Sequence, residues 1–133
     1  KMNNTMNEFI KQVDIKHEVN KHGYPVLDTE AVMQIADRIG LHTLAAREGL
    51  RIAIDNIQLM DKKHIDYGPR NISDFGEMGV VMEMNNKMCR IKNLIKPGGR
   101  KRAKNEPIED SYRDISNYSI IALMVRKGVW PNV

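Results

Sequence analysis

Apolar residues recur every three or four positions along most of this chain, and that spacing is the strongest signal in the sequence. It places the apolar side chains on one side of an α-helix, whereas a half-buried strand requires alternation with a period of two. The nearest approach to a strand signal, Gly79-Val80-Val81, lies inside a helical stripe. The spacing therefore predicts an all-α fold, a helical bundle of about five helices.

Glycines and a capping residue mark the first two of these helices. One helix is expected over about residues 5–21, where apolar residues have helical spacing and Gly23 follows. A second is expected to begin at an N-cap, Asp28, and to end at Gly40.

A third helix is expected over about residues 43–62. Its Gly49 costs roughly 1 kcal/mol relative to alanine unless a neighbour packs against it. Residues 64–71 are expected to form a loop, because the pair Gly68-Pro69 breaks helices and favours extended backbone at the glycine.

Two long helices are predicted in the C-terminal half. Asp74 and Glu77 have the spacing of a capping box and should open the fourth helix. The fifth should begin near Pro107, since proline is favoured in the first turn, and end at Gly128. The predicted buried face of the fourth helix consists of Met78, Val81, Met82, Met88 and Ile95.

Length and composition are those of one globular domain, expected to span residues 1–133. The single cysteine, Cys89, excludes an internal disulfide and fits a cytoplasmic location. No apolar run approaches the roughly 20 residues that cross a bilayer. Of the 21 basic residues, five lie between Lys96 and Lys104, which leaves 16 against 17 acidic residues elsewhere. Nucleic-acid binders usually spread their positive charge over a face, so we do not expect nucleic acid as a partner. Because no apolar run is long enough to cross a bilayer, we do not expect a membrane either.

An acidic row marks the last helix. Glu106, Asp110, Asp114 and Asn117 follow at i, i+4, i+8 and i+11, which stacks four oxygen-bearing groups along one side. Carboxylates one turn apart repel each other, and a cation or a facing basic row would relieve this repulsion. The alternative is a solvated acidic face that favours the start of the helix.

The fourth helix carries a matching row, Glu83, Lys87 and Arg90. If the two rows face each other, Glu83, Asp110 and Asp114 form a Mg²⁺ site, since Mg²⁺ prefers carboxylates and substrate phosphates. Lys87 and Arg90 would then hold phosphate oxygens, and Asn117 would contact the nucleotide. The alternative is an ordinary surface pair of Glu83 with Lys87.

The predicted loop is rich in side chains suited to reading a base or a ribose. The alternative is a loop that only ends a helix, in which Asp and Asn side chains form hydrogen bonds with backbone groups of the turn. Such a loop needs few of these special side chains. The candidate nucleotide-binding residues of this segment are His64, Asp66, Tyr67, Arg70 and Asn71.

Three segments resemble the nucleotide modification associated domain family of phages and bacteria, the first of that name. They are residues 64–72 (HIDYGPRNI), residues 106–118 (EPIEDSYRDISNY) and residues 84–94. The last is similar to the family's Asp-Lys-x-x-Arg-x-x-Asn-Leu helix, with Asn86 where an acid is common. The resemblance covers about residues 43–125 and leaves the expected N-terminal helix, within residues 1–27, outside.

This resemblance implies a helical domain linked to phage nucleotide metabolism in the host cytoplasm. The chain is also distantly similar to the MazG-like all-α NTP pyrophosphatases, which hydrolyse nucleoside triphosphates with Mg²⁺ and complete their sites by oligomerising. The Glu-Glu-x-x-Glu helix of that group is missing, because Glu77 and Glu83 are six residues apart and lie on different sides of a helix.

Two functions remain open at this point. The first is a Mg²⁺-dependent nucleoside triphosphate pyrophosphohydrolase, a homo-oligomer with Glu83, Asp110 and Asp114 as catalytic and metal-binding residues. The second is a non-catalytic sponge that sequesters a nucleotide, including a cyclic one, and so counters host anti-phage defence. A structural or DNA-associated helical protein has less support.

Overall fold

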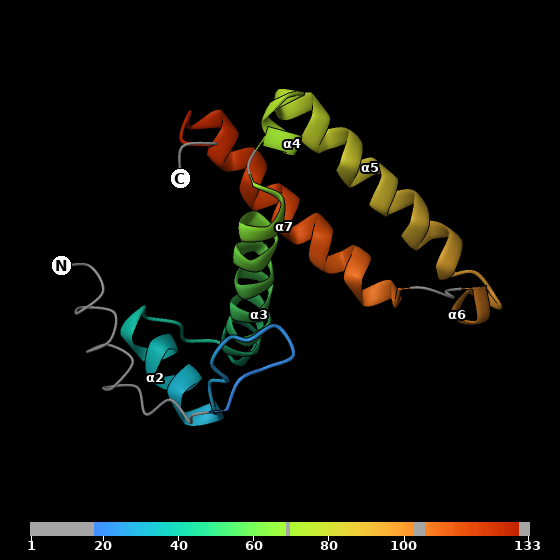
Figure 1. The fold of residues 1–133 in the computed structure, drawn as a ribbon. Coiled ribbons are helices and arrows are strands. Elements are labelled where there is room, and N and C mark those ends of the chain that lie inside the picture. Colours follow the sequence, from blue (N-terminus) through green and yellow to red (C-terminus); the bar gives the residue numbers. More distant parts are fainter. Residues whose placement is uncertain (1–17, 69, 103–105, 131–133) are drawn as a thin grey trace. The chain divides into compact units, whose positions relative to one another are not determined.

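The computed structural model describes residues 18–68, 70–102 and 106–130, and within them the protein is all-helical (Figure 1). An isolated bridge between Val19 and Pro25 is the one β-type pairing recorded in this part of the chain. The all-α prediction is confirmed, and in these ranges no helix is long and apolar enough to cross a bilayer. The helices are α2 (Thr29–Arg38), α3 (Leu44–Tyr67), α4 (Arg70–Ser73), α5 (Gly76–Leu94), α6 (Gly99–Arg102) and α7 (Ile108–Arg126).

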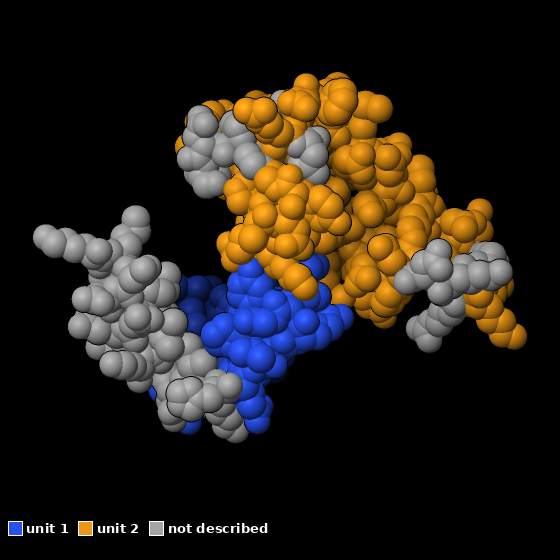
Figure 2. Space-filling view, in the orientation of Figure 1, with its two compact units in different colours: residues 1–59 blue, residues 60–133 orange. Residues whose placement is uncertain are grey.

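The chain divides into two compact units, Lys1–Leu59 and Met60–Val133 (Figure 2). The division falls inside α3, so the last two turns of that helix belong to the second unit. The sequence-based expectation of one domain over residues 1–133 stays a prediction.

In the first unit, α2 begins and ends where its capping residues predict. The Asp28 carboxylate accepts a hydrogen bond from the Ala31 backbone N–H at 2.8 Å, which satisfies one of the unpaired donors of the first turn. Gly40 follows the C-cap with a φ of 75°, a conformation that glycine adopts without strain. Ala31, Val32 and Ala36 form the buried face.

The segment before α2 corrects the predicted first helix. Residues 18–27 are not helical, because the Asn20 side chain offers the backbone another hydrogen-bonding pattern. Its Oδ1 accepts from the N–H groups of His22 at 2.9 Å and Tyr24 at 3.1 Å, and its Nδ2 donates to Gln58 on α3. The rest of the predicted helix lies outside the described residues.

Helix α3 continues beyond its predicted end, to Tyr67. A loop over residues 64–71 was therefore wrong: residues 64–67 extend α3, and α4 starts at Arg70. No residue between Lys62 and Tyr67 breaks a helix, so the breaking signal acts only at Gly68. Gly68 has a φ of 68°, left-handed instead of the predicted extended backbone, and its N–H donates to the His64 carbonyl at 2.9 Å.

The start of α5 also differs from the prediction. Phe75 is its N-cap and makes no side-chain capping hydrogen bond, so the capping box of Asp74 and Glu77 was wrong. Glu77 instead pairs with Arg126 at the end of α7, at 2.9 Å. A longer-range ion pair thus replaces the local cap.

Helices α5 and α7 lie side by side and antiparallel (Figure 1). Their contacts follow one antiparallel register: as the residue number rises along α5, the number of the contacting residue on α7 falls. Glu77 meets Arg126, Lys87 meets Asp114 and Arg90 meets Ser111. Their core consists of Val80, Ile121 and Trp130.

The predicted buried face of α5 was wrong. Met78 and Met82 are 67% and 62% exposed, and Val81, Met88 and Ile95 are exposed as well. The face that packs on α7 is the opposite one, with Val80, Ile91 and Leu94. Since α5 is apolar on two sides, helical spacing alone did not identify the side that is buried.

Gly99, the first residue of α6, has no room for a side chain. A Cβ added there would lie 2.8 Å from the Leu94 Cα and closer still to the Leu94 carbonyl. We expect Gly99→Ala to lower the free energy of unfolding by about 1–3 kcal/mol, the usual cost of overpacking, in urea denaturation. Gly49→Ala, where an added Cβ meets no described atom within 4 Å, should instead raise it by about 0.5–1 kcal/mol. Similar effects of the two substitutions would contradict this assignment.

Candidate functional site

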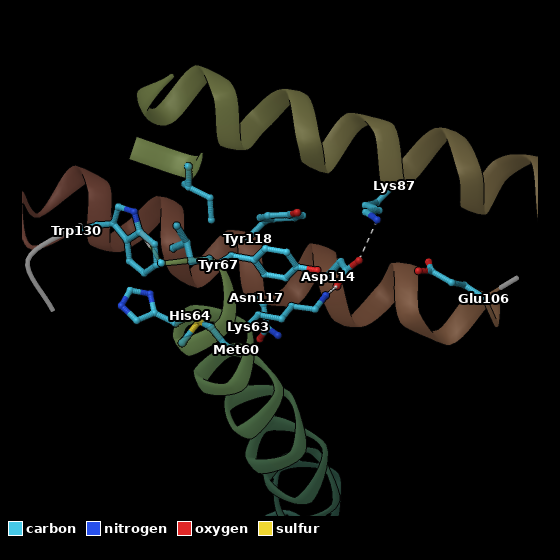
Figure 3. A pocket seen from close by; sticks show the side chains of 13 residues that line it. Met60, Lys63, His64, Tyr67, Lys87, Glu106, Asp114, Asn117, Tyr118 and Trp130 are labelled. Carbon is cyan, nitrogen blue, oxygen red and sulfur yellow. Dashed lines mark hydrogen bonds and ion pairs between the residues drawn. The ribbon is translucent and has the colours of Figure 1, made fainter. Parts of the chain in front are cut away.

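The second unit holds a pocket of about 280 Å³ where the end of α3 meets α4, α5 and α7 (Figure 3). This volume is close to the lower end of the roughly 300–1,000 Å³ typical of small-molecule sites. The lining residues are Met60, Lys63, His64, Tyr67, Gly68, Ile72, Lys87, Glu106, Asp114, Asn117, Tyr118, Ile121 and Trp130.

A buried carboxylate held by two lysines forms the polar part of the pocket. Lys63 Nζ donates to Asp114 Oδ1 at 2.8 Å, and Lys87 Nζ lies 3.0 Å from Asp114 Oδ2 (Figure 3). The Asp114 side chain is 10% exposed, whereas those of Lys63 and Lys87 are 49% and 25% exposed. A buried charge is tolerated where it is paired, so the two ammonium groups stabilise the Asp114 carboxylate inside the fold.

The carboxylate also shifts two titrating neighbours. Burial alone would lower the pKa of Lys87, but the hydrogen bond and the charge of Asp114 outweigh it, so the net shift is upward. Burial raises the pKa of the Tyr118 phenol, and the negative charges of Asp114 and Glu83 raise it further. At neutral pH Lys87 therefore carries its charge, and Tyr118 keeps its proton.

The other end of the pocket is aromatic. The rings of His64 and Trp130 meet edge to face with centroids 5.0 Å apart. Trp130 is 9% exposed, and Tyr67 is 72% exposed at the end of α3. Neither His64 Nδ1 nor Trp130 Nε1 has a hydrogen-bond partner among the described residues, although both atoms are buried. Two polar groups with hydrogen-bonding capacity therefore lie within an apolar, aromatic wall.

The structure brings together five of the candidate site residues, because His64, Tyr67, Lys87, Asp114 and Asn117 all line the pocket, and Glu106 of the acidic row lines it as well. The others do not line it, and for Asn71 the side chain lies outside the described part of the structure. The remaining residues of that set are Asp66, Arg70, Glu83, Arg90 and Asp110.

Arg90 has a different role from the predicted phosphate contact. Its guanidinium donates to the Ser111 hydroxyl at 2.7 Å and to the Pro107 carbonyl at 3.3 Å, and it also donates to the carbonyl of Glu106. Arg90 thus holds the start of α7 against α5.

The carboxylates present do not fit the predicted Mg²⁺ site. Both Asp114 oxygens are paired with lysines, and Asp110 pairs with Arg113 at 3.0 Å. Glu83 is exposed and lies one turn from Lys87 along α5. Among the described residues no three His, Cys, Asp or Glu side chains are grouped as a metal ion requires.

Several pocket residues were missed by the sequence analysis. Once α3 is known to extend to Tyr67, Met60, Lys63, His64 and Tyr67 have the i, i+3, i+4, i+7 spacing of one helix face. That spacing was available in the sequence but was hidden by the predicted loop. Ile121 and Trp130 carried no signal for a binding site, and Tyr118 was noted only as the last residue of the family-like segment 106–118.

A family model matches most of this unit. Residues 63–125 match the family model described as nucleotide modification associated domain 1. The resemblance seen in the sequence is thereby confirmed, although the match begins at Lys63 and not near residue 43. No curated protein and no solved structure matched the chain. The matched segment includes Lys63, Lys87 and Asp114 and ends before Trp130.

The buried ion-pair cluster predicts a clear asymmetry between two aspartates of α7. We expect Asp114→Asn to lower the free energy of unfolding by about 1–3 kcal/mol, because it leaves two lysines facing each other without an anion. Their partial exposure keeps the loss below that of a fully buried pair. Asp110→Asn, at a 36% exposed side chain, is the matched control and should cost less than about 1 kcal/mol in the same urea titration. Equal losses would contradict the assigned role of Asp114.

The raised pKa values of Lys87 and Tyr118 predict a loss of stability at alkaline pH. Their ordinary values are 10.5 and 10.0, and both groups hold protons more tightly in the folded protein than in the unfolded chain. Their contribution is therefore complete below about pH 10 and is lost as the pH rises through the raised folded values. In urea titrations between about pH 8 and 11, the free energy of unfolding should fall more steeply for the wild type than for Tyr118→Phe. Parallel pH profiles would show that the phenol does not contribute.

Proposed function

We propose that the pocket of the second unit binds a nucleotide. The observation that carries this proposal is a pair of lysines, Lys63 and Lys87, in a pocket whose other end is aromatic. A nucleotide has the same division, with an anionic phosphate at one end and a flat aromatic base at the other.

The two lysines suit a phosphate. Each ammonium group has three donors and uses one on Asp114, so donors remain for phosphate oxygens. Asp114 holds the two groups near one another, because they share its carboxylate. This arrangement reduces the side-chain freedom that a ligand would otherwise have to restrict on binding.

The aromatic end suits a base. Tyr67, Tyr118, His64 and Trp130 supply ring surface, and stacking on aromatic side chains contributes about 1–3 kcal/mol per base. Asn117 also lines the pocket, and its amide has both donors and acceptors. An amide of this kind suits recognition of a base edge or a ribose hydroxyl.

The family description, nucleotide modification associated, agrees with a nucleotide ligand. We further propose that binding requires no divalent metal, because Asp114 and Asp110, the two aspartates predicted as metal ligands, are engaged with lysine and arginine. This favours retention of the nucleotide, as in a sponge, over Mg²⁺-dependent hydrolysis of a nucleoside triphosphate to its monophosphate. Retention of an immune signal would be one use of such a pocket.

The test compares two lysines of α5. Nucleotides that raise the melting temperature in the presence of EDTA are titrated calorimetrically into wild type, Lys87→Met and Lys92→Met. Lys92 is exposed and does not line the pocket, so it is the matched control. Lys87→Met should weaken binding about 10- to 100-fold, because a hydrogen bond to a charged group contributes about 1.5–3 kcal/mol, whereas Lys92→Met should change it less than about twofold.

Two results would overturn the proposal. One is the absence of a melting shift with every nucleotide tested. The other is an equal effect of the two lysine substitutions. Product release that requires Mg²⁺ would restore the hydrolase hypothesis instead.

A further inference from the structure

The charges that line the pocket limit how much negative charge a ligand can bring. Lys63 and Lys87 contribute two positive charges, and the carboxylates of Asp114 and Glu106 contribute two negative ones. The positive and negative charges of these four lining side chains are therefore equal before a ligand enters. Proteins that hold triphosphates offset the larger charge with metal ions and several basic groups.

Glu106 lies at the pocket end opposite the aromatic residues. Figure 3 shows Lys63, Asp114 and Lys87 between it and the pair His64 and Trp130. The order along α7 agrees, because Glu106 lies two residues before its first residue, Ile108, and Asp114 lies roughly 9 Å beyond Ile108 along the helix axis. A phosphate chain that starts at the lysines and extends away from the base meets the Glu106 carboxylate next.

The backbone at Glu106 is held in place. Arg90 donates to its carbonyl and to that of Pro107, so the start of α7 stays close to the lysine pair. The negative charge of Glu106 also contributes to the raised pKa of Lys87, which indicates that it is felt at that ammonium group. A fixed backbone keeps this charge near the mouth of the phosphate end.

We infer that the pocket selects a nucleotide with a single phosphate group over the matched di- or triphosphate, and that Glu106 sets this limit. A second phosphate would bring negative charge towards the Glu106 carboxylate with no additional basic side chain among the described lining residues to offset it. The inference rests on the proposed nucleotide-binding function.

The experiment measures phosphate-chain preference directly. The mono-, di- and triphosphates of adenosine, guanosine, cytidine and uridine, and their deoxy forms, are titrated into the full chain in EDTA at constant ionic strength. The best monophosphate should bind about tenfold tighter than its triphosphate, because like charges at close range weaken binding strongly. The titrations are repeated with Glu106→Gln and with Glu109→Gln, an exposed glutamate in the first turn of α7 that does not line the pocket.

Glu106→Gln should remove most of that preference by strengthening triphosphate binding about tenfold, with less than about twofold change for the monophosphate. Glu109→Gln should leave the preference unchanged. A wild-type triphosphate that binds as tightly as the monophosphate, or a preference that survives Glu106→Gln, would overturn the inference while the proposed function stands. If no nucleotide binds, the proposed function fails and this inference with it.

Discussion

The buried carboxylate of Asp114 is the interaction on which the second unit depends. It is the point where α3, α5 and α7 are joined by charge, since Lys63 comes from the first and Lys87 from the second of these helices. The apolar core lies farther along the same helices, around Val80 and Ile121, and Met60 of α3 packs against it. A misplaced α3 would leave a buried negative charge incompletely paired. That energetic cost makes the cluster a determinant of structure as well as a candidate binding site.

The sequence predicts the fold class and the ends of α2, but it does not predict which side of α5 is buried. Helical spacing gave the all-α class, and the local signals at Asp28 and Gly40 gave the ends of α2. The buried side of α5 could not be predicted from the sequence, because that helix is apolar on opposite sides. Only its packing on α7 determines that Val80 is buried and Met82 is exposed. Spacing records where apolar residues lie around a helix, whereas burial depends on where the partner helix lies.

The candidate site shows the same limit in its polar residues. Asp114 and Lys87 were found because both lie in charged rows, and the antiparallel pairing of α5 with α7 places them opposite each other. The same register explains why Glu83 does not complete a metal site with Asp110. Arg90 already faces Ser111, so Asp110 lies beyond Arg90, about two turns along α5 from Glu83. Lys63 was missed for a local reason, since the end of α3 had been assigned to a loop.

Arg90 and Lys87 show how one turn of helix separates two roles. Both are basic, both lie on α5 on the side of α7, and the sequence gives no ground for treating them differently. The register sets Lys87 opposite a carboxylate that borders the pocket, whereas Arg90 meets the hydroxyl and carbonyl groups at the start of α7. A guanidinium has five N–H donors, and carbonyl groups can accept from them without neutralising its charge. Arg90 therefore holds the backbone at the start of α7, while Lys87 remains beside the pocket. Two basic side chains in one row therefore serve different purposes, one in building the wall of the pocket and the other in supplying its charge.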